Sequence, residues 1–242
     1  YDVEAGNNTY DNAVIENSKI SEKNKIQNNQ SMLDDIMNST QYPKQLKDLA
    51  LKNEEALEFV FDYPAEHVKE NTIDLTEEAS MDSVPLFVQW DKRWGYEKYS
   101  GNFFAASGCG PTTLSMVVVY LTHNRDASPI AVAKYSKEAG YSVDGSGSSW
   151  TLISEGCMHY GVKAKAVALD ESRMKAELDE GHPIVVNVGP GDFTDTGHFM
   201  VITGYDDEGF SINDPNSIEK SGKRWLFKNI SSQIRAVWSM YV

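Results

Sequence analysis

Hydrophobic positions recur at helical spacing through the middle of the chain. An apolar stretch from Leu114 to Leu121 follows Pro111, and this pattern predicts a buried helix that begins near Cys109. Capping residues and glycines bound three further helical patterns, so we expect helices over residues 129–139, 149–160 and 170–180.

The pattern changes after residue 183, where short runs rich in β-branched residues replace the helical spacing. These runs predict strands over residues 184–188, 199–203, 210–213, 225–227 and 236–241. The polar residues 206–209 predict a hairpin turn between the second and third of these strands. Helices followed by a series of adjacent strands indicate an α+β fold with an antiparallel sheet.

Charge divides the chain into two parts. Residues 1–83 hold 18 acidic and 7 basic side chains, a net charge of −11, whereas residues 84–242 hold 18 and 15, a net charge of −3. Aromatic residues and glycines also concentrate after Val84. We therefore predict an acidic N-terminal extension over residues 1–83 and a compact domain over residues 84–242.

The predicted extension has two kinds of sequence. Residues 1–41 are rich in asparagine and read as a solvated arm; their helical stripe is irregular, with Ile15, Ile20, Ile26, Leu33 and Ile36. Residues 43–64 are more strongly patterned and predict two short helices, with Asn53 as the cap of the second. One hypothesis is that the acidic arm lies over the substrate groove and keeps an enzyme inactive. Deletion of residues 1–41 tests this hypothesis.

Composition excludes several classes of function. A net charge of −14 disfavours a nucleic-acid partner, because such proteins present a basic face. The longest apolar run, residues 116–121, is far shorter than the roughly 20 residues of a membrane span. Two cysteines make neither a disulfide framework nor a four-thiolate zinc site, and no histidine spacing supports zinc. We expect no cofactor and no metal.

Cys109 is the main candidate for chemistry. Glycines on both sides, Gly108 and Gly110, let backbone approach a ligand closely. A cysteine at a helix N-terminus also has a lowered thiol pKa, because the helix dipole and free N–H groups stabilise the thiolate. We interpret Cys109 as a nucleophile and Cys157, inside a predicted helix, as a core thiol. A disulfide between the two cysteines would disable the nucleophile.

A cysteine nucleophile needs a base, and His198 is the best placed of five histidines. It stands at the start of the predicted strand 199–203, where its side chain can reach across a cleft. The others lie in polar, turn or helical surroundings that suit surface or capping roles: His67, His123, His159 and His182.

Two further groups complete such a site. The predicted hairpin brings Asp214 close to His198, so its carboxylate can orient the imidazole; Asn213 and Asn216 compete for that role. The amide of Gln89, upstream of the cysteine, can donate to a developing oxyanion together with the Cys109 backbone N–H.

Four sequence blocks carry a resemblance to a known family. Residues 84–91 with Trp94, residues 107–112, residues 197–199 and residues 213–217 follow one another in the order found in peptidase-like proteins related to the bacteriocin-processing, double-glycine cysteine peptidases. The resemblance covers about residues 84–242. It implies a papain-like fold, in which a helical lobe carries the cysteine and a sheet lobe carries histidine and aspartate.

The resemblance also implies roles and a setting. Cys109 is the nucleophile, His198 the general base, Asp214 its orienter and Gln89 the second oxyanion donor, acting on a peptide or protein substrate without metal. The processing peptidases are usually part of a membrane transporter. We expect no transporter here, so their leader specificity is not carried over. The extension resembles the leading region of secreted bacterial members, which favours an extracellular or cell-surface location.

Substrate contacts are expected from Gly108 and Gly197, beside the two reacting residues, and from Trp150, after the flexible stretch 145–149. Two other functions remain open. A non-catalytic peptide-binding module would keep the cleft without turnover, and an acyl transferase or transpeptidase would pass the acyl group to an amine.

Overall fold

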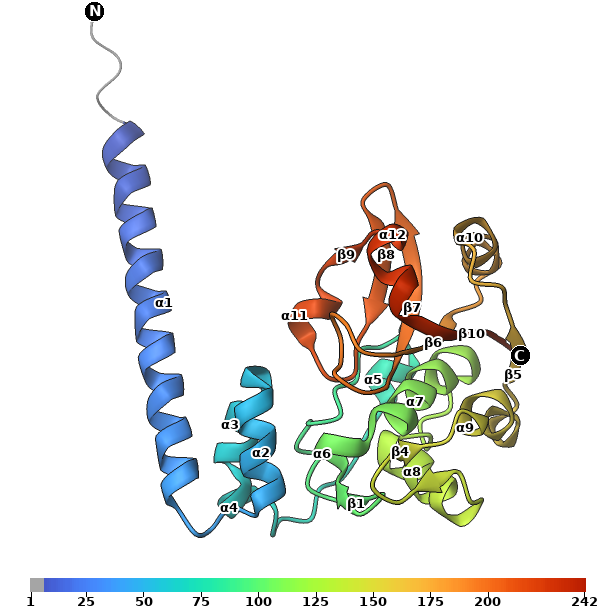
Figure 1. Ribbon diagram of the computed structural model, residues 1–242, viewed down its shortest axis with the longest axis horizontal. Helices are drawn as coiled ribbons and strands as arrows, with labels where there is room; N and C mark the ends of the chain where they lie inside the picture. The colour runs from blue at the N-terminus through green and yellow to red at the C-terminus, as the bar shows by residue number, and fades with distance from the viewer. Residues whose placement is uncertain (1–6) are drawn as a thin grey trace, which may run out of the picture. The chain divides into compact units, whose positions relative to one another are not determined.

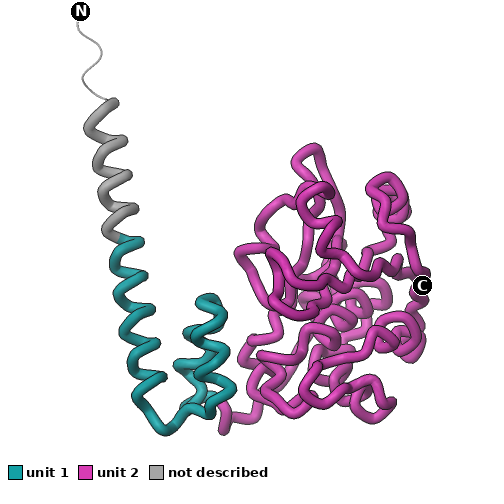
Figure 2. Tube along the Cα trace, viewed as in Figure 1, with its two compact units in different colours: residues 1–66 teal, residues 67–242 magenta. Residues whose placement is uncertain are grey.

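The computed structural model describes residues 7–242, with side chains from residue 21 onward. It divides the chain into two compact units, Tyr1–Glu66 and His67–Val242, which Figure 2 colours separately. The acidic extension that we predicted ends later, at residue 83. The difference has a physical reason: Leu75 and Ala79 pack into the core of the second unit, so the segment before Val84 is part of that core.

The first unit is helical. Its elements are α1 (Asn7–Asn38), α2 (Lys44–Lys52), a short 3-10 turn (Glu54–Ala56), α3 (Leu57–Phe61) and α4 (Tyr63–Glu66). Asn53 caps the 3-10 turn by accepting a hydrogen bond from the Glu55 N–H, as its side chain suggested. Ile36 is fully buried with Leu46 and Val60. The unit therefore has a small core of its own.

Residues 7–38 form one continuous helix where we predicted a solvated arm. Among the described side chains of its apolar stripe, Ile36 near the C-terminal end is buried, whereas Ile26 is 61% exposed. The side chains of Ile15 and Ile20 lie outside the described residues.

The second unit combines helices with an antiparallel sheet (Figure 1), which confirms the predicted α+β class. Its helices are α5 (Thr76–Ala79), α6 (Phe104–Ser107), α7 (Cys109–Thr122), α8 (Pro129–Glu138), α9 (Thr151–Ser154), α10 (Glu171–Asp179), α11 (Ile218–Ser221) and α12 (Phe227–Ile230). We predicted one helix over residues 149–160. The structure instead has the short helix α9, followed by a 3-10 helix, Gly156–Tyr160.

Six strands form the main sheet in the order β5-β10-β6-β7-β8-β9. They are β5 (Lys163–Ala166), β6 (Ile184–Val188), β7 (His198–Asp206), β8 (Gly209–Asn213), β9 (Arg224–Trp225) and β10 (Ile234–Tyr241). The strand predicted over residues 225–227 ends at Trp225, because Phe227 begins α12. The sequence pattern did not predict β5, because its alternating Lys and Ala residues are largely exposed and do not form an apolar run.

Two hydrophobic cores cover the two faces of this sheet. One lies between the sheet and α7, and it includes Leu114, Val118 and Phe199. The other lies on the opposite face against α10 and α12, with Met174, Val186 and Ile230. α7 is buried along most of its length because its residues from Gly110 to Val119 contact other elements all round.

Two small hairpins border the N-terminal end of α7. β1 (Lys98–Tyr99) pairs with β2 (Asn102–Phe103), and β3 (Ser142–Val143) pairs with β4 (Gly147–Ser148). The turn between β1 and β2 has positive φ at Ser100, 53°, and at Gly101, 78°, as a two-residue hairpin requires. Ser100 thus adopts a left-handed backbone conformation, which is uncommon for a residue other than glycine.

Candidate active site

Cys109 is the first residue of α7 and is half-buried. The glycine after it is required by packing: a Cβ on Gly110 would lie 2.6 Å from the Ser148 Oγ. The helix is also tied to the sheet, because the Thr113 hydroxyl donates to the Phe199 carbonyl over 3.1 Å. The sulfur is therefore held at a fixed place between the helices and β7.

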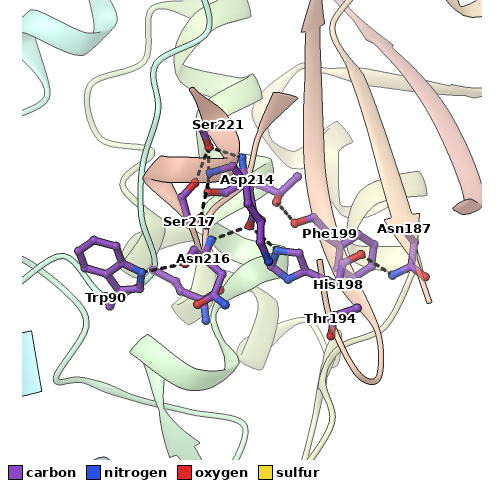
Figure 3. Close-up of polar contacts among 12 residues, drawn as sticks. Trp90, Asn187, Thr194, His198, Phe199, Asp214, Asn216, Ser217 and Ser221 are labelled. Atoms are coloured by element: carbon purple, nitrogen blue, oxygen red, sulfur yellow. Dashed lines mark hydrogen bonds and ion pairs between the residues drawn. The ribbon is translucent and has the colours of Figure 1, made fainter. Parts of the chain in front are cut away.

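His198 and Asp214 meet in the structure. The His198 Nε2 and the Asp214 Oδ1 lie 2.6 Å apart, and both side chains are buried (Figure 3). His198 begins β7 and Asp214 follows β8; these strands pair antiparallel with Val201 opposite Asn213. The hairpin register therefore brings the two residues together.

The Asp214 carboxylate is positioned by its own loop. The Asn216 backbone N–H donates to Oδ1 over 2.8 Å, while the Asp214 N–H donates to the Ser221 hydroxyl over 2.9 Å (Figure 3). Asn213, a competitor in the sequence, instead donates from its side chain to the carbonyls of Val84 and Pro85. Asp214 is thus the acidic partner of the imidazole.

The electrostatics of Cys109 and His198 favour an ion pair. Burial alone raises the pKa of the Cys109 thiol, but the hydrogen bond and charge of His198, together with backbone hydrogen bonds from Phe199 and Gly110, outweigh it, so that pKa lies below its usual value. Burial opposes the charged imidazole, yet the charge and hydrogen bond of Asp214, with the Cys109 thiolate, raise the pKa of His198 to about 10. Both shifts favour the thiolate–imidazolium form of the pair over the neutral form.

The imidazole has two nitrogens, and Asp214 occupies Nε2, which leaves Nδ1 for Cys109. The Phe199 and Gly110 backbone groups also form hydrogen bonds that stabilise the thiolate. The site thus contains a thiol, an imidazole and a carboxylate in one hydrogen-bonded series, an arrangement that is capable of nucleophilic chemistry.

Gln89 is buried near this series. Its Nε2 donates to the Ala105 carbonyl over 2.7 Å, and its backbone N–H donates to the Pro215 carbonyl over 2.7 Å. Next to it, the Trp90 indole donates to the Asn216 carbonyl over 3.1 Å (Figure 3). The Gln89 segment is therefore fastened to the loop that holds Asp214. Within the described residues, the Gln89 Oε1 is buried without a partner.

A cleft of about 540 Å³ opens at Cys109. Its helical side is formed by residues 100–102, 106–107 and 145–148 with Trp150, and its sheet side by Asn187, Thr196, Gly197 and Phe199. Trp150 and Gly197 line the cleft. Gly108 does not; a Cβ there would meet the Phe104 ring at 2.6 Å, so this glycine serves packing.

Ser100 connects the two hairpins on the helical side of the cleft. Its hydroxyl accepts from the Gly147 N–H over 2.9 Å and donates to the Val143 carbonyl. Its own carbonyl accepts from the Gly145 N–H over 3.0 Å. The turn signal Ser100-Gly101 is visible in the sequence, but only the fold shows that this turn supports a wall of the cleft.

The remaining thiol and imidazoles have other surroundings. Cys157 is fully buried, burial raises its thiol pKa to about 11, and both cysteines are free, so they form no disulfide in the described chain. His123 bonds the Ala79 carbonyl, and His159 stacks on Tyr135.

His182 belongs to a separate cluster. Ligand atoms of Glu177, Glu180 and His182 lie within 4.8 Å of one another, a spacing that metal sites also have. The Glu177 carboxylate, however, already accepts from the Lys165 ammonium and the Ser239 hydroxyl. We attach no metal role to this cluster.

The chain is similar to known proteins. A family model described as the Peptidase_C39 like family matches residues 81–242. Two solved structures are similar in part. One is the peptidase domain of Streptococcus ComA, a bi-functional ABC transporter involved in a quorum sensing pathway: 19% identity, 56% of this chain and 90% of that chain covered, TM-score 0.43. The other is described as a C39-like peptidase from Bacillus anthracis: 18% identity, 66% and 95% covered, TM-score 0.40.

No curated protein matches the chain. In the part of the chain that the structure describes, no helix combines the length and apolar character needed to cross a membrane.

Proposed function

The chain belongs to the Peptidase_C39 like family, and on that premise we propose that it is a cysteine peptidase that hydrolyses peptide bonds through a thioester on Cys109. One observation carries the proposal: Cys109, His198 and Asp214 are linked by hydrogen bonds, with the thiol pKa lowered and the imidazole pKa raised. A cysteine that serves only in packing has a raised thiol pKa, because burial alone makes a thiol less acidic. The lowered pKa of Cys109 therefore favours a nucleophile.

Acylation begins with the thiolate. The Cys109 Sγ attacks the peptide carbonyl carbon, and the carbonyl electron pair moves onto oxygen. As the tetrahedral intermediate collapses, the C–N bond breaks and His198 gives its proton to the departing amine. The product is a thioester on Cys109 and a neutral imidazole that Asp214 holds in place.

Deacylation uses the same residues in reverse roles. The neutral His198 removes a proton from water as the water oxygen attacks the thioester carbonyl. Collapse of this second intermediate breaks the C–S bond, releases the carboxylic acid and restores the thiolate and imidazolium. The Asp214 carboxylate stabilises the positive imidazole by its charge.

Gln89 is our candidate for the second oxyanion donor. Its Nε2 carries two N–H groups; one bonds the Ala105 carbonyl, and we assign the other, with the Cys109 backbone N–H, to the oxyanion. Gln89→Ala is expected to lower kcat about 10²- to 10³-fold while changing KM little, since the bond exists mainly in the transition state. Steady-state kinetics measure this, and an unchanged kcat removes Gln89 from the mechanism.

Asp214→Asn tests the source of the imidazole charge. The amide oxygen still accepts from Nε2, so orientation is kept while the negative charge is lost. Because that charge raises the pKa of His198, the variant's imidazolium loses its proton at lower pH. We expect kcat/KM to fall about tenfold to a hundredfold, the effect of one charged hydrogen bond, and its alkaline limb to move to lower pH.

The matched control is Asp207→Asn, which makes the same chemical change in the exposed turn at the far end of the β7–β8 hairpin. Its pH profile should match that of the unmodified protein. If Asp214→Asn keeps the original alkaline limb as well, the carboxylate does not set the imidazole pKa.

The direct test of the function is incubation of the full chain with a diverse peptide pool, with products read by mass. Peptidase activity predicts new termini and a transient acyl adduct on Cys109. Added amine distinguishes hydrolysis from transfer, because a transferase gives products heavier by the amine. A thiol-directed probe that labels Cys109 without any cleavage of the pool would contradict the proposal and favour a peptide-binding module.

A further inference from the structure

The cleft beside Cys109 is almost free of charge. Among its lining residues in the described chain, none besides Cys109 is ionisable. The helical side consists mainly of small residues, including Ser100, Gly101 and Gly147, and also has Trp150. The sheet side differs, because it presents a single buried amide, Asn187, within an apolar strand.

Register places Asn187 next to the reacting sulfur. Asn187 on β6 pairs directly with Phe199 on β7, so their side chains share one face of the sheet. The Phe199 backbone itself hydrogen-bonds the Cys109 sulfur. On its other side Asn187 pairs with Ala236, whose small side chain leaves room beside the amide. Asn187 and Cys109 therefore line the same cleft.

The two polar atoms of the Asn187 side chain are in different states. Its Nδ2 donates to the His198 carbonyl over 3.2 Å, and this direction is fixed because a carbonyl only accepts (Figure 3). Its Oδ1 has no hydrogen-bond partner among the described residues. Asn187 is only 6% exposed, but its Oδ1 is not among the fully buried polar atoms that lack a partner, and the residue lines the cleft. An acceptor is thus open to a substrate.

Aromatic rings border the same region. Trp150 and Phe199 both line the cleft, and both contact Trp238: the Trp150 ring edge-on at 6.0 Å and the Phe199 ring tilted at 6.4 Å. Trp150 is 48% exposed, so its ring is available to a ligand. Aromatic rings therefore border the cleft on both sides, Trp150 on the helical side and Phe199 on the sheet side, where it is paired with Asn187.

We propose that Asn187 is a specificity-determining residue whose Oδ1 accepts a hydrogen bond from a substrate side chain that ends in a hydroxyl or primary amide. This inference rests on the proposed peptidase function. A hydroxyl or amide donor matches a neutral acceptor. A substrate ammonium group would lose its hydration in the cleft, where no carboxylate of the described residues lines the wall to compensate. A substrate carboxylate would face the Asn187 Oδ1, which is an acceptor and offers it no hydrogen bond.

The test compares near-isosteric peptide pairs. Starting from a peptide that the full chain cleaves, Thr is exchanged for Val and Asn for Leu at each position near the scissile bond. At one position we expect the donor-bearing peptide to have a kcat/KM about tenfold higher, the size that one neutral hydrogen bond supports. Asn187→Leu should abolish or reverse this preference at that position alone. The ratio within one variant is independent of any general loss of activity.

A second variant and a control keep the outcome decisive. Asn187→Asp keeps an acceptor and adds charge, so it should favour Lys over Met at the same position even if Asn187→Leu folds poorly. Asn229→Leu changes an exposed asparagine on α12 and should leave all ratios as they were.

Three results are informative. Loss of the preference in Asn187→Leu with a gain for Lys in Asn187→Asp supports the assignment. Cleavage with side-chain preferences that neither variant alters overturns it and leaves the peptidase function standing. Absence of cleavage of any peptide by the unmodified chain overturns the proposed function, and the inference with it.

Discussion

Replacing Cys109 with alanine is expected to abolish peptide hydrolysis, with kcat/KM lower by on the order of 10⁴-fold or more. The sulfur is the atom that bonds the substrate carbonyl, and alanine offers no nucleophile in its place. The variant should still fold, because Cys109 is half-buried at the helix start and its loss leaves little cavity. Product formation from a cleaved peptide, followed by mass or fluorescence, measures the effect.

Cys157→Ala is the matched control, since it removes the other thiol from the same unit. Cys157 is fully buried and its thiol pKa is raised to about 11, so it is a poor nucleophile. We expect this variant to lose stability by about 1–3 kcal/mol, as small core truncations do, and to keep its turnover. Full activity in Cys109→Ala, or loss of turnover in Cys157→Ala at a temperature where it is folded, would contradict the assignment.

Replacing His198 with alanine is expected to lower kcat/KM about 10³- to 10⁴-fold. The variant lacks the group that protonates the departing amine and that activates water in the second half of the reaction. It also lacks the positive charge that lowers the Cys109 pKa, so less thiolate is present at neutral pH. Kinetics across the pH range measure both losses.

Free imidazole provides a sharper readout for this variant. Alanine leaves a space where the ring was, so imidazole from solution should restore part of the activity to His198→Ala in proportion to its concentration. It should not restore Cys109→Ala. Because the Asp214 carboxylate is left buried without its partner, the fold of His198→Ala must be checked by thermal unfolding. A folded His198→Ala with unaltered kcat/KM refutes the role of the imidazole.

Local signals in the sequence were sufficient for much of the second unit. Glycines and a proline around Cys109 define where α7 begins, and β-branched runs define β6, β7 and β8. The polar turn at residues 206–209 sets the hairpin register, and the structure has the His198–Asp214 contact that this register allows. These features are predictable because each depends on residues close together in the chain.

Other features depend on contacts between distant segments. Leu75 and Ala79 lie in a polar, acidic stretch, yet they pack on the α7 core, so charge alone misplaces the domain boundary. Ser100 supports a wall through Val143 and Gly147, more than forty residues away. Asn187 carries a visible signal, an amide in an otherwise apolar strand, but only its pairing with Phe199 shows that it faces the cleft.

The central claim is that the Cys109 thiol is ionised by His198, and alkylation tests it most directly. Iodoacetamide labelling of each cysteine is followed by mass between about pH 4 and pH 10, for the unmodified chain and for His198→Ala. We predict that Cys109 reacts well below the roughly pH 8.5 midpoint of a free thiol, that Cys157 hardly reacts, and that His198→Ala moves the Cys109 curve to higher pH. Equal, slow labelling of both cysteines, with a curve that His198→Ala leaves in place, would contradict the claim.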